Sequence, residues 1–325
     1  MTKKRTCKYC SPDGWQCDEP AGESGLCYWH DPDIDKSKDE DVKDRVEQWA
    51  KDGKPLDGFQ LSRAKLEDIN LVNRGCREGY KCRDVDFYRA DLRNAHFFGL
   101  DLRGSSLMKS TLAGANLHCA KLENCNLLGA DLSRARLENV EWGEQLQQER
   151  KAMDAISVKD TKKAVELCQE AEEVARCIRK QCEKEGLFEI AGHFFKKEMI
   201  FRRYQMPLYS SKRIISKGVD LFCGYGESPI RVVMFSVCLI FMCALAYFFL
   251  GTTASNPIYP DVHGYKATFL EFLNALYFSV VTFTTLGYGD ISPIGLARFI
   301  AAFEAFLGSF TMALFVVVFV KKMTR

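Results

Sequence analysis

The chain has 325 residues, and its charges nearly cancel, because 45 Lys and Arg residues oppose 43 Asp and Glu residues for a formal net charge of +2 at pH 7. This balance argues against bulk nucleic-acid binding, since no segment is basic enough to neutralise many phosphates. Most of the charge lies in residues 1–227, and two long apolar runs follow it. The class of fold therefore has to be predicted segment by segment.

The N-terminal segment has the Cys and His spacing of a small metal-binding unit. Cys7, Cys17, Cys27 and His30 follow the pattern C-x9-C-x9-C-x2-H, and Cys10 forms a C-x2-C pair with Cys7. Four thiolate and imidazole ligands suit a closed tetrahedral zinc site, in which Cys10 competes with Cys7 for one position. A segment this short has little apolar core, so a structural zinc ion would supply folding energy. The alternative is a set of reduced cysteines without a metal.

A hydrophobic period of five residues starts at Leu61, breaks over Val72–Cys82 with a register shift of one residue, and resumes at Phe87. From Phe87 to Leu137 every fifth residue is Leu or Phe. Small residues lie two positions before most of them, at Ala90, Ala95, Ser105, Ala115, Ala120, Ala130 and Ala135. A period of five fits neither helix nor strand, and it indicates repeated units that stack on one another.

The repeated segment resembles the pentapeptide-repeat family. The resemblance implies a right-handed, four-sided β-helix in which Leu or Phe points into the core and the small residue fills the corner. The break leaves open whether one continuous solenoid spans both sides of it. Arginines and lysines are mixed with the acidic residues of 84–140. This mixture argues against the strongly acidic surface by which some pentapeptide proteins imitate DNA.

Two helices are predicted after the repeats. Glu144–Cys182 carries apolar residues at spacings of three and four, which indicates an amphipathic helix that Gly186 can end. A second helix follows and stops before Pro207. The pair resembles one tetratricopeptide unit. The next segment contains Gly224-Tyr225-Gly226, which we expect to form an interfacial turn without a role in conduction.

Two apolar runs, Val232–Leu250 and Leu296–Val320, are each long enough to span a bilayer, which needs about 20 helical residues. A buried soluble core is the alternative, but the polar remainder cannot wrap two such helices. Basic residues flank the outer ends of the two runs, at Lys212, Arg213, Lys217, Arg231, Lys321, Lys322 and Arg325, while Lys266 is the one basic residue between the runs before Arg298. We therefore expect a multi-pass protein of the cell membrane with both termini cytoplasmic.

Neither end of the chain adds a further expected domain. The start, MTKKRTCKYC, has no apolar stretch typical of a signal peptide, and Arg325 follows the second run directly. Any cytoplasmic sensor is therefore expected on the N-terminal side. The loop between the two runs contains no cysteine, so we expect no disulfide framework.

Ala267–Thr284 is apolar but too short to cross the bilayer together with its flanking turns, which predicts a re-entrant helix. The string Thr284-Thr285-Leu286-Gly287-Tyr288-Gly289-Asp290 follows it. This string resembles the selectivity filter of potassium channels, and two spans around one pore helix resemble the two-helix members of that family. The resemblance implies an ion-conducting filter of Thr285, Leu286, Gly287, Tyr288 and Gly289, in which the carbonyls of the first four residues and the Thr285 hydroxyl hold potassium ions. It also implies a homotetramer of this chain with three further copies of itself.

Five positions in or near the filter bear on this expectation. Thr284 and Asp290 are expected to support the filter, but Val281 stands where some family members place a carboxylate that pairs with the aspartate. Glu304 lies inside the second apolar run, where a buried carboxyl is costly and indicates a function, either structural pairing behind the filter or a role in permeation. Gly308 is a candidate hinge for an inner gate, or else a site of close helix packing.

The expected fold class is a membrane α protein with two transmembrane helices and a re-entrant pore helix, preceded by a pentapeptide β-helix and a helical hairpin. The expected segments are a zinc-binding unit at 1–30, an acidic linker at 31–58, the β-helix at 59–142, the hairpin at 143–206, an interfacial linker at 207–230, the first transmembrane helix at 231–250, the pore helix and filter at 267–294 and the second transmembrane helix at 295–320.

The expected function is a potassium-selective channel whose N-terminal domains gate or assemble the pore, through an unknown cytoplasmic ligand or protein. The alternative is a membrane-anchored pentapeptide-repeat scaffold without significant conduction. No nucleophile with a base and no phosphate-binding loop supports an enzyme, and no arginine-rich span supports classical voltage gating.

Overall fold

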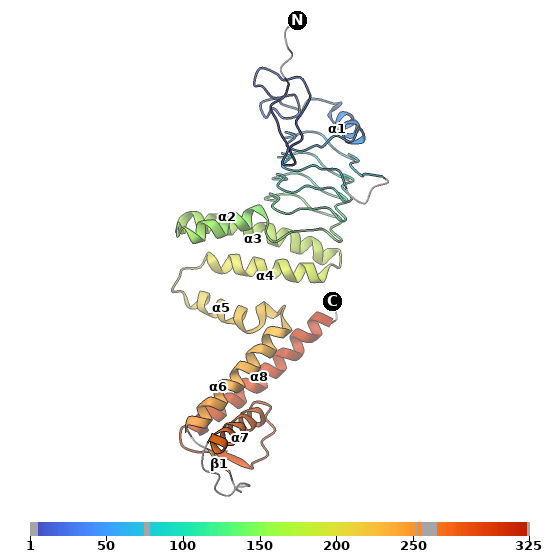
Figure 1. The fold of residues 1–325 in the computed structure, drawn as a ribbon. Helices are drawn as coiled ribbons and strands as arrows, with labels where there is room; N and C mark the ends of the chain where they lie inside the picture. The colour runs from blue at the N-terminus through green and yellow to red at the C-terminus, as the bar shows by residue number, and fades with distance from the viewer. Residues whose placement is uncertain (1–5, 75–78, 251, 255–264, 324–325) are drawn as a thin grey trace. The chain divides into compact units, whose positions relative to one another are not determined.

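The computed structural model describes residues 6–74, 79–250, 252–254 and 265–323, and it divides into two compact units, Met1–Ser210 and Ser211–Arg325 (Figure 1). Two features used in the topology prediction, Arg325 and the side chain of Lys266, lie outside the described part. The first unit contains α1 (Val42–Lys51), the stacked repeats, α2 (Gln147–Ser157), α3 (Thr161–Lys184) and α4 (Phe188–Tyr204). The second contains α5 (Ser211–Cys223), the short 3-10 helix η1 (Gly224–Gly226), α6 (Pro229–Leu250), β1 (Thr252–Ala254), α7 (Tyr265–Phe283), β2 (Ile291–Pro293) and α8 (Ala297–Met323).

The repeats form a solenoid with four pentapeptides in each coil. Parallel bridges join Asp86 to Ser106 and Ser106 to Asn126, so the chain returns to the same side every twenty residues. The fifth-position Leu and Phe side chains are fully buried, as predicted, and the small residues are buried beside them. The third residue of each turn adopts a left-handed backbone, which explains why Gly99, Gly104 and Gly114 recur there.

The break in the repeat pattern does not interrupt the solenoid. Gln60, Lys65 and Asn70 form parallel bridges with Asp86, Asp91 and His96, which lie 26 residues later. The first coil therefore carries six residues more than a regular coil of twenty. Six is one more than a pentapeptide, which accounts for the register shift of one residue in the sequence. The open question about continuity is thereby answered for the described residues.

Both ends of the solenoid are covered by other parts of the first unit. At the N-terminal end, the Trp29 ring stacks on Phe59 at 4.9 Å, and the Trp29 carbonyl accepts a hydrogen bond from the Gln60 amide. At the other end, the Gln181 side chain of α3 donates to the Ala135 carbonyl at 3.0 Å and accepts from the Arg134 amide at 3.3 Å. The Gln181 side-chain amide thus forms the hydrogen bonds that a further coil would form with the last coil. These bonds protect the exposed backbone edge of the last coil from pairing with another chain.

Three helices follow the solenoid, where the sequence predicted a hairpin of two. The predicted helix over Glu144–Cys182 is divided into α2 and α3, because Lys159 adopts a left-handed backbone and Asp160 caps α3 by accepting from the Lys163 amide. Gly186 ends α3 in a left-handed conformation, as predicted. Helices α3 and α4 pack antiparallel, and Glu198 of α4 binds Arg179 of α3 at 2.8 Å.

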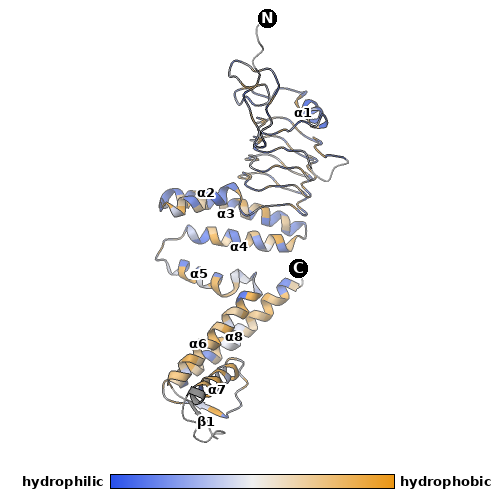
Figure 2. Ribbon diagram, viewed as in Figure 1, coloured by the Kyte–Doolittle hydropathy of each residue, from blue (hydrophilic) through white to orange (hydrophobic). Residues whose placement is uncertain are grey.

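The second unit contains two helices long and apolar enough to cross a membrane, α6 and α8, and a shorter apolar helix, α7, between them in sequence. Figure 2 shows the apolar residues concentrated on these three helices. The predicted linker 207–230 instead contains a helix, α5, and the turn at Gly224–Gly226. Helix α5 was missed because a glycine at 218 and mixed charges obscured its periodicity. A short antiparallel pair joins β1 to β2, with Thr253 opposite Ser292.

Candidate pore and metal site

The segment after α7 has the backbone expected of a filter strand. Positive φ angles occur at every second residue, at Thr285 (58°), Gly287 (58°) and Gly289 (79°), whereas Leu286 and Tyr288 between them are not positive. Such alternation turns successive peptide groups so that their carbonyls can face one side. The two glycines adopt these angles without strain, but a β-branched threonine does so at a cost. The strand is exposed in the single chain, including its Leu286 and Tyr288 side chains.

The strand is anchored at its start to the end of α7, the candidate pore helix. The Thr284 hydroxyl donates to the Val280 carbonyl at 2.7 Å, and the Leu286 amide donates to the Val281 carbonyl at 3.0 Å. These bonds satisfy carbonyls that would otherwise be unpaired at the C-terminus of a helix. The position of Thr285 is therefore fixed relative to α7.

Asp290, at the far end of the strand, has a pore-helix partner that the sequence analysis did not identify. Val281 is apolar and buried, as read from the sequence. One helical turn earlier, the Tyr277 hydroxyl is hydrogen-bonded to the Asp290 carboxylate. Asp290 also accepts a hydrogen bond from the Ile291 amide at 3.1 Å. Asp290 is therefore bound to α7 through Tyr277, and not through a carboxylate at position 281 as in some members of the family.

Glu304 of α8 joins three elements behind the strand. Its side chain is fully buried. Its Oε2 accepts a hydrogen bond from the Tyr247 hydroxyl of α6 at 2.6 Å, and its Oε1 lies 2.5 Å from Oγ of Ser279 in α7. The same Ser279 Oγ lies 2.8 Å from the Ile240 carbonyl oxygen of α6. These contacts correspond to the structural pairing considered for this residue.

Gly308, one turn after Glu304, faces the end of the pore helix. A Cβ atom at this position would lie 2.0 Å from the Phe283 carbonyl oxygen, which is far inside van der Waals contact. Close backbone packing of α8 on α7 is therefore sufficient to explain a glycine at 308.

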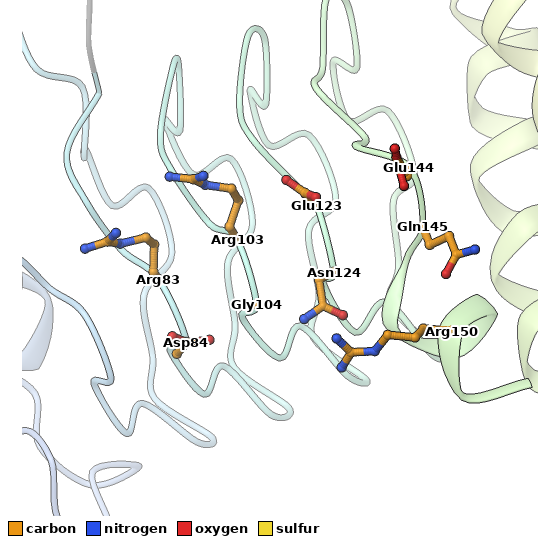
Figure 3. A pocket seen from close by; sticks show the side chains of 9 residues that line it. All are labelled: Arg83, Asp84, Arg103, Gly104, Glu123, Asn124, Glu144, Gln145 and Arg150. Atoms are coloured by element: carbon orange, nitrogen blue, oxygen red, sulfur yellow. The ribbon is translucent and has the colours of Figure 1, made fainter. Parts of the chain in front are cut away.

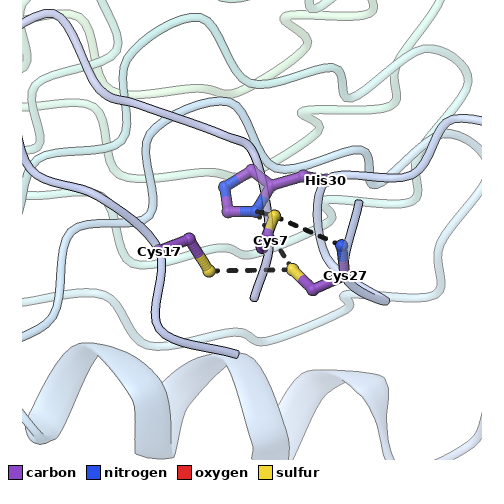
Figure 4. Close-up of side chains that lie close together, drawn as sticks. All are labelled: Cys7, Cys17, Cys27 and His30. Atoms are coloured by element: carbon purple, nitrogen blue, oxygen red, sulfur yellow. Dashed lines mark hydrogen bonds between the residues drawn. The ribbon is translucent and has the colours of Figure 1, made fainter. Parts of the chain in front are cut away.

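A buried cluster of four side chains lies near the N-terminus (Figure 4). Cys7, Cys17, Cys27 and His30 bring their ligand atoms within 4.8 Å of one another, whereas Cys10 is exposed and lies outside the cluster. The Cys17 and Cys27 sulfurs are 3.8 Å apart, and Cys7 Sγ lies 3.6 Å from His30 Nδ1. A tetrahedral zinc ion with bonds of about 2.3 Å to sulfur has edges of about 3.8 Å, so the residues fit that metal.

Neighbouring groups hold the cluster in a form suited to a metal. His30 Nε2 donates to the Asp57 carbonyl at 3.1 Å, which leaves Nδ1 free to act as a ligand. The Asp57 side chain in turn binds Arg83 at 2.6 Å, and Arg83 also binds Asp13 at 2.8 Å. Burial raises the pKa of the Cys17 thiol to about 12 and lowers the pKa of His30 to about 4. A bound metal would have to replace the thiol protons.

Comparison with known proteins identifies two families in the chain. Residues 234–325 match the ion channel family, and residues 86–122 and 115–141 match pentapeptide repeats. The chain joins pentapeptide repeats to an ion channel domain. The channel domain includes most of α6, all of α7 and α8. No curated protein matches the chain.

Solved structures similar to the chain are pentapeptide repeat proteins. One is Rfr23 from the cyanobacterium Cyanothece 51142, with 26% identity over 28% of this chain and 58% of that protein, at a TM-score of 0.24. Another is HetL, involved in heterocyst differentiation regulation in Nostoc sp. strain PCC 7120, with 27% identity over 27% of this chain and 51% of that protein, at a TM-score of 0.17. The chain thus spans little more than half the length of either protein.

The solenoid also carries a polar hollow of about 430 Å³ on one side, next to the start of α2 (Figure 3). It is lined by Arg83, Asp84, Arg103, Gly104, Glu123, Asn124, Glu144, Gln145 and Arg150. Arg83 and Arg103 are held by carboxylates outside the lining, namely Asp57 and Asp101. Cationic and anionic groups are present in equal numbers, so the lining has no net preference for a charged ligand.

Sequence reasoning selected the candidate filter and metal-site residues but not the residues that contact them. Tyr277, Ser279 and Tyr247 act as hydrogen-bond partners inside the channel domain. Tyr277 precedes Asp290 by thirteen residues, so the contact becomes visible only once the chain reverses after α7. The polar side chains of Tyr277 and Ser279 within the otherwise apolar helix α7 were the sequence signal that could have indicated these contacts.

Proposed function

We propose that the chain is one subunit of a homotetrameric, potassium-selective channel of the cell membrane, with both termini cytoplasmic. The alternating backbone of residues 285–289, anchored to the shorter apolar helix α7 between two long apolar helices, is the observation that carries the proposal. Four copies of this strand around one axis would surround a dehydrated potassium ion with rings of oxygen. The carbonyls of Thr285, Leu286, Gly287 and Tyr288 and the Thr285 hydroxyl would supply them.

The exposed filter strand supports the tetramer. A single chain offers one wall of a pore, and its Leu286 and Tyr288 side chains are 59% and 68% exposed. Apolar and aromatic side chains at the centre of an apolar domain would pack against neighbouring subunits instead of facing water. Asp290 and Glu304 would then support the strand from behind, through Tyr277 and through Ser279 with Tyr247.

The N-terminal unit would assemble or gate this pore from the cytoplasmic side, and a structural zinc ion at Cys7, Cys17, Cys27 and His30 would stabilise it. The zinc ion would hold the N-terminal segment against the first coil, because His30 is bound to Asp57 and Asp57 to Arg83. A polar hollow on the solenoid and the exposed sides of the coils leave room for a cytoplasmic ligand or protein.

Ion flux from liposomes tests the proposed function. The full chain, reconstituted as a tetramer, should release potassium in preference to sodium and should be blocked by barium. Gly287→Asp should abolish this flux, because Gly287 has a left-handed backbone in the strand. Gly226→Asp is the matched control, since Gly226 has a similar φ of 80° in a second Gly-Tyr-Gly string outside the channel domain. Folded tetramers that stay silent over a range of voltage and pH would favour the membrane-anchored scaffold.

A further inference from the structure

The polar hollow on the solenoid separates its positive and negative charges along the coils. Residues 83, 103 and 123 occupy the same position of three successive coils, which lie about 4.8 Å apart. Arg83 and Arg103 give the first two of these coils a positive charge, whereas Glu123 and then Glu144 give the following turns a negative one (Figure 3). The hollow is balanced in charge as a whole, but it presents opposite charges to the two ends of a bound molecule.

Arg103 and Glu123 lie on neighbouring coils, but they do not form an ion pair with each other. Elsewhere on the solenoid, His118 and Glu138 have the same spacing of twenty residues and approach to 3.2 Å. Arg103 instead binds Asp101 of its own coil, through Nε at 2.8 Å and Nη2 at 2.7 Å. Within the described residues, Nη1 of Arg103 and the carboxylate of Glu123 therefore remain available to a ligand in the hollow.

Three more charged side chains of the lining form no ion pair or hydrogen bond to another described residue, namely Asp84, Glu144 and Arg150 of α2. Burial raises the pKa of Asp84, so its charged form would be stabilised by a nearby cation. Arg83, in contrast, gives all of its side-chain nitrogens to two carboxylates outside the lining. The groups left for a ligand are therefore three carboxylates, one guanidinium and a single nitrogen of Arg103.

The composition of the lining indicates the chemistry of a ligand. Apart from Gly104, every lining residue is charged or carries a side-chain amide, so an apolar ligand would gain little from binding. The amides of Asn124 and Gln145 can each donate and accept hydrogen bonds. A suitable ligand carries one cationic and one anionic group close together, because the opposite charges of the hollow lie on adjacent coils. An α-amino acid has both groups on one carbon, and a polar side chain would pair with the amides.

We propose that the hollow binds a polar, zwitterionic α-amino acid, with its ammonium group at Glu123 and its carboxylate at Arg150 and Nη1 of Arg103. The ligand would join α2 to the solenoid, because Arg150 belongs to α2 and the other two residues belong to successive coils. It would be the cytoplasmic ligand of the N-terminal unit. This regulatory role rests on the proposed function, whereas binding to the hollow does not.

Isothermal titration calorimetry of the full chain in detergent tests this inference, with L-glutamine as the probe. We expect saturable binding that weakens at high salt, because the main contacts are ionic. N-acetyl-L-glutamine lacks the ammonium charge and the α-amide of L-glutamine lacks the carboxylate, so each should bind about tenfold more weakly. L-leucine keeps both charges but has an apolar side chain, and it should also bind more weakly than L-glutamine.

Matched variants locate the binding site. Glu123→Gln and Arg150→Gln should each weaken L-glutamine binding about tenfold, and both should keep the melting temperature of the unchanged protein because the two side chains are exposed. Glu166→Gln on α3 and Arg63→Gln on the first coil remove the same charges from exposed positions outside the hollow and should leave binding unchanged.

Two results would overturn the proposed amino-acid site. One is the absence of L-glutamine binding at millimolar concentrations, and the other is equal binding of L-glutamine and its N-acetyl derivative. Unchanged affinity in the variant that combines Glu123→Gln with Arg150→Gln would also contradict it. None of these measurements involves ion flux, so a failed channel assay and a failed binding assay are separate results.

Discussion

Glu304 and Ser279 bring α8 and the pore helix within hydrogen-bonding distance, at 2.5 Å between Oε1 and Oγ. Ser279 Oγ also lies 2.8 Å from the Ile240 carbonyl oxygen. A serine hydroxyl has one hydrogen, so an ionised Glu304 would leave one of these two contacts without a proton. A protonated Glu304 donates to Ser279, Ser279 donates to Ile240, and Tyr247 donates to the other carboxyl oxygen. The hydrogen-bond count therefore favours the neutral acid.

This arrangement predicts that Glu304→Gln is tolerated and Glu304→Ala is not. A glutamine amide can donate to Ser279 and accept from Tyr247, whereas alanine leaves the buried Tyr247 hydroxyl without its acceptor and removes the donor to Ser279, which keeps only its bond to Ile240. The alanine variant should lose about 1–3 kcal/mol for the unsatisfied Tyr247 hydroxyl, measured as a lower thermal stability of the purified tetramer. Glu271→Ala is a control, because Glu271 of α7 is exposed. Equal damage from Gln and Ala would indicate an ionised carboxylate.

The contact between Tyr277 and Asp290 is expected to hold the outer end of the filter. Tyr277→Phe removes only the hydroxyl that binds Asp290, so the pore helix should keep its packing. We expect the tetramer to form and the potassium flux to decline faster with time than in the unchanged protein. Asp290→Asn should weaken the same bond. If the double variant declines much faster than either single variant, the two residues act independently and the contact is not the cause.

Metal analysis of two cysteine variants distinguishes the ligands of the N-terminal cluster. Purified protein is expected to contain about one zinc ion per chain, bound by three thiolates and one imidazole. Cys7→Ser should lose most of this zinc, because Cys7 lies inside the cluster. Cys10→Ser should retain it, because the Cys10 side chain is exposed outside the cluster. A zinc content near zero in the unchanged protein would contradict the metal site. Loss of zinc from Cys10→Ser would contradict the choice of Cys7 as the ligand.

Replacing Gly308 should mainly damage packing. Gly308→Ala places a methyl group 2.0 Å from the Phe283 carbonyl oxygen, so α8 and the pore helix must move apart. Overpacking of this kind costs about 1–3 kcal/mol and should lower tetramer stability as well as flux. Gly218→Ala on α5 is the control, because nothing lies within 4 Å of its new methyl group. A Gly308→Ala tetramer of normal stability that opens less often would support the hinge.

The sequence alone determined the repeating parts of the first unit and the order of the channel domain. A five-residue period identifies buried Leu and Phe positions because every coil repeats the same environment, and all of those positions from Phe87 to Leu137 are buried. The same sequence left the break at Val72–Cys82 open, because the partner of each bridge depends on the length of the first coil. Helix α5 was missed because Gly218 interrupts its apolar periodicity. The division of α2 from α3 was missed because it depends on the left-handed backbone of Lys159, which the periodicity of the segment does not indicate.

Residue types and spacing were also enough to identify the filter string and the set of Cys and His residues as candidates. Only the tertiary structure chose Cys7 over Cys10, since both have suitable spacing and just one points into the cluster. It also gave Asp290 its Tyr277 partner and Glu304 its contacts with Ser279 and Tyr247. These contacts join residues 13 to 57 positions apart, and such pairings depend on where the chain reverses, which no local pattern encodes.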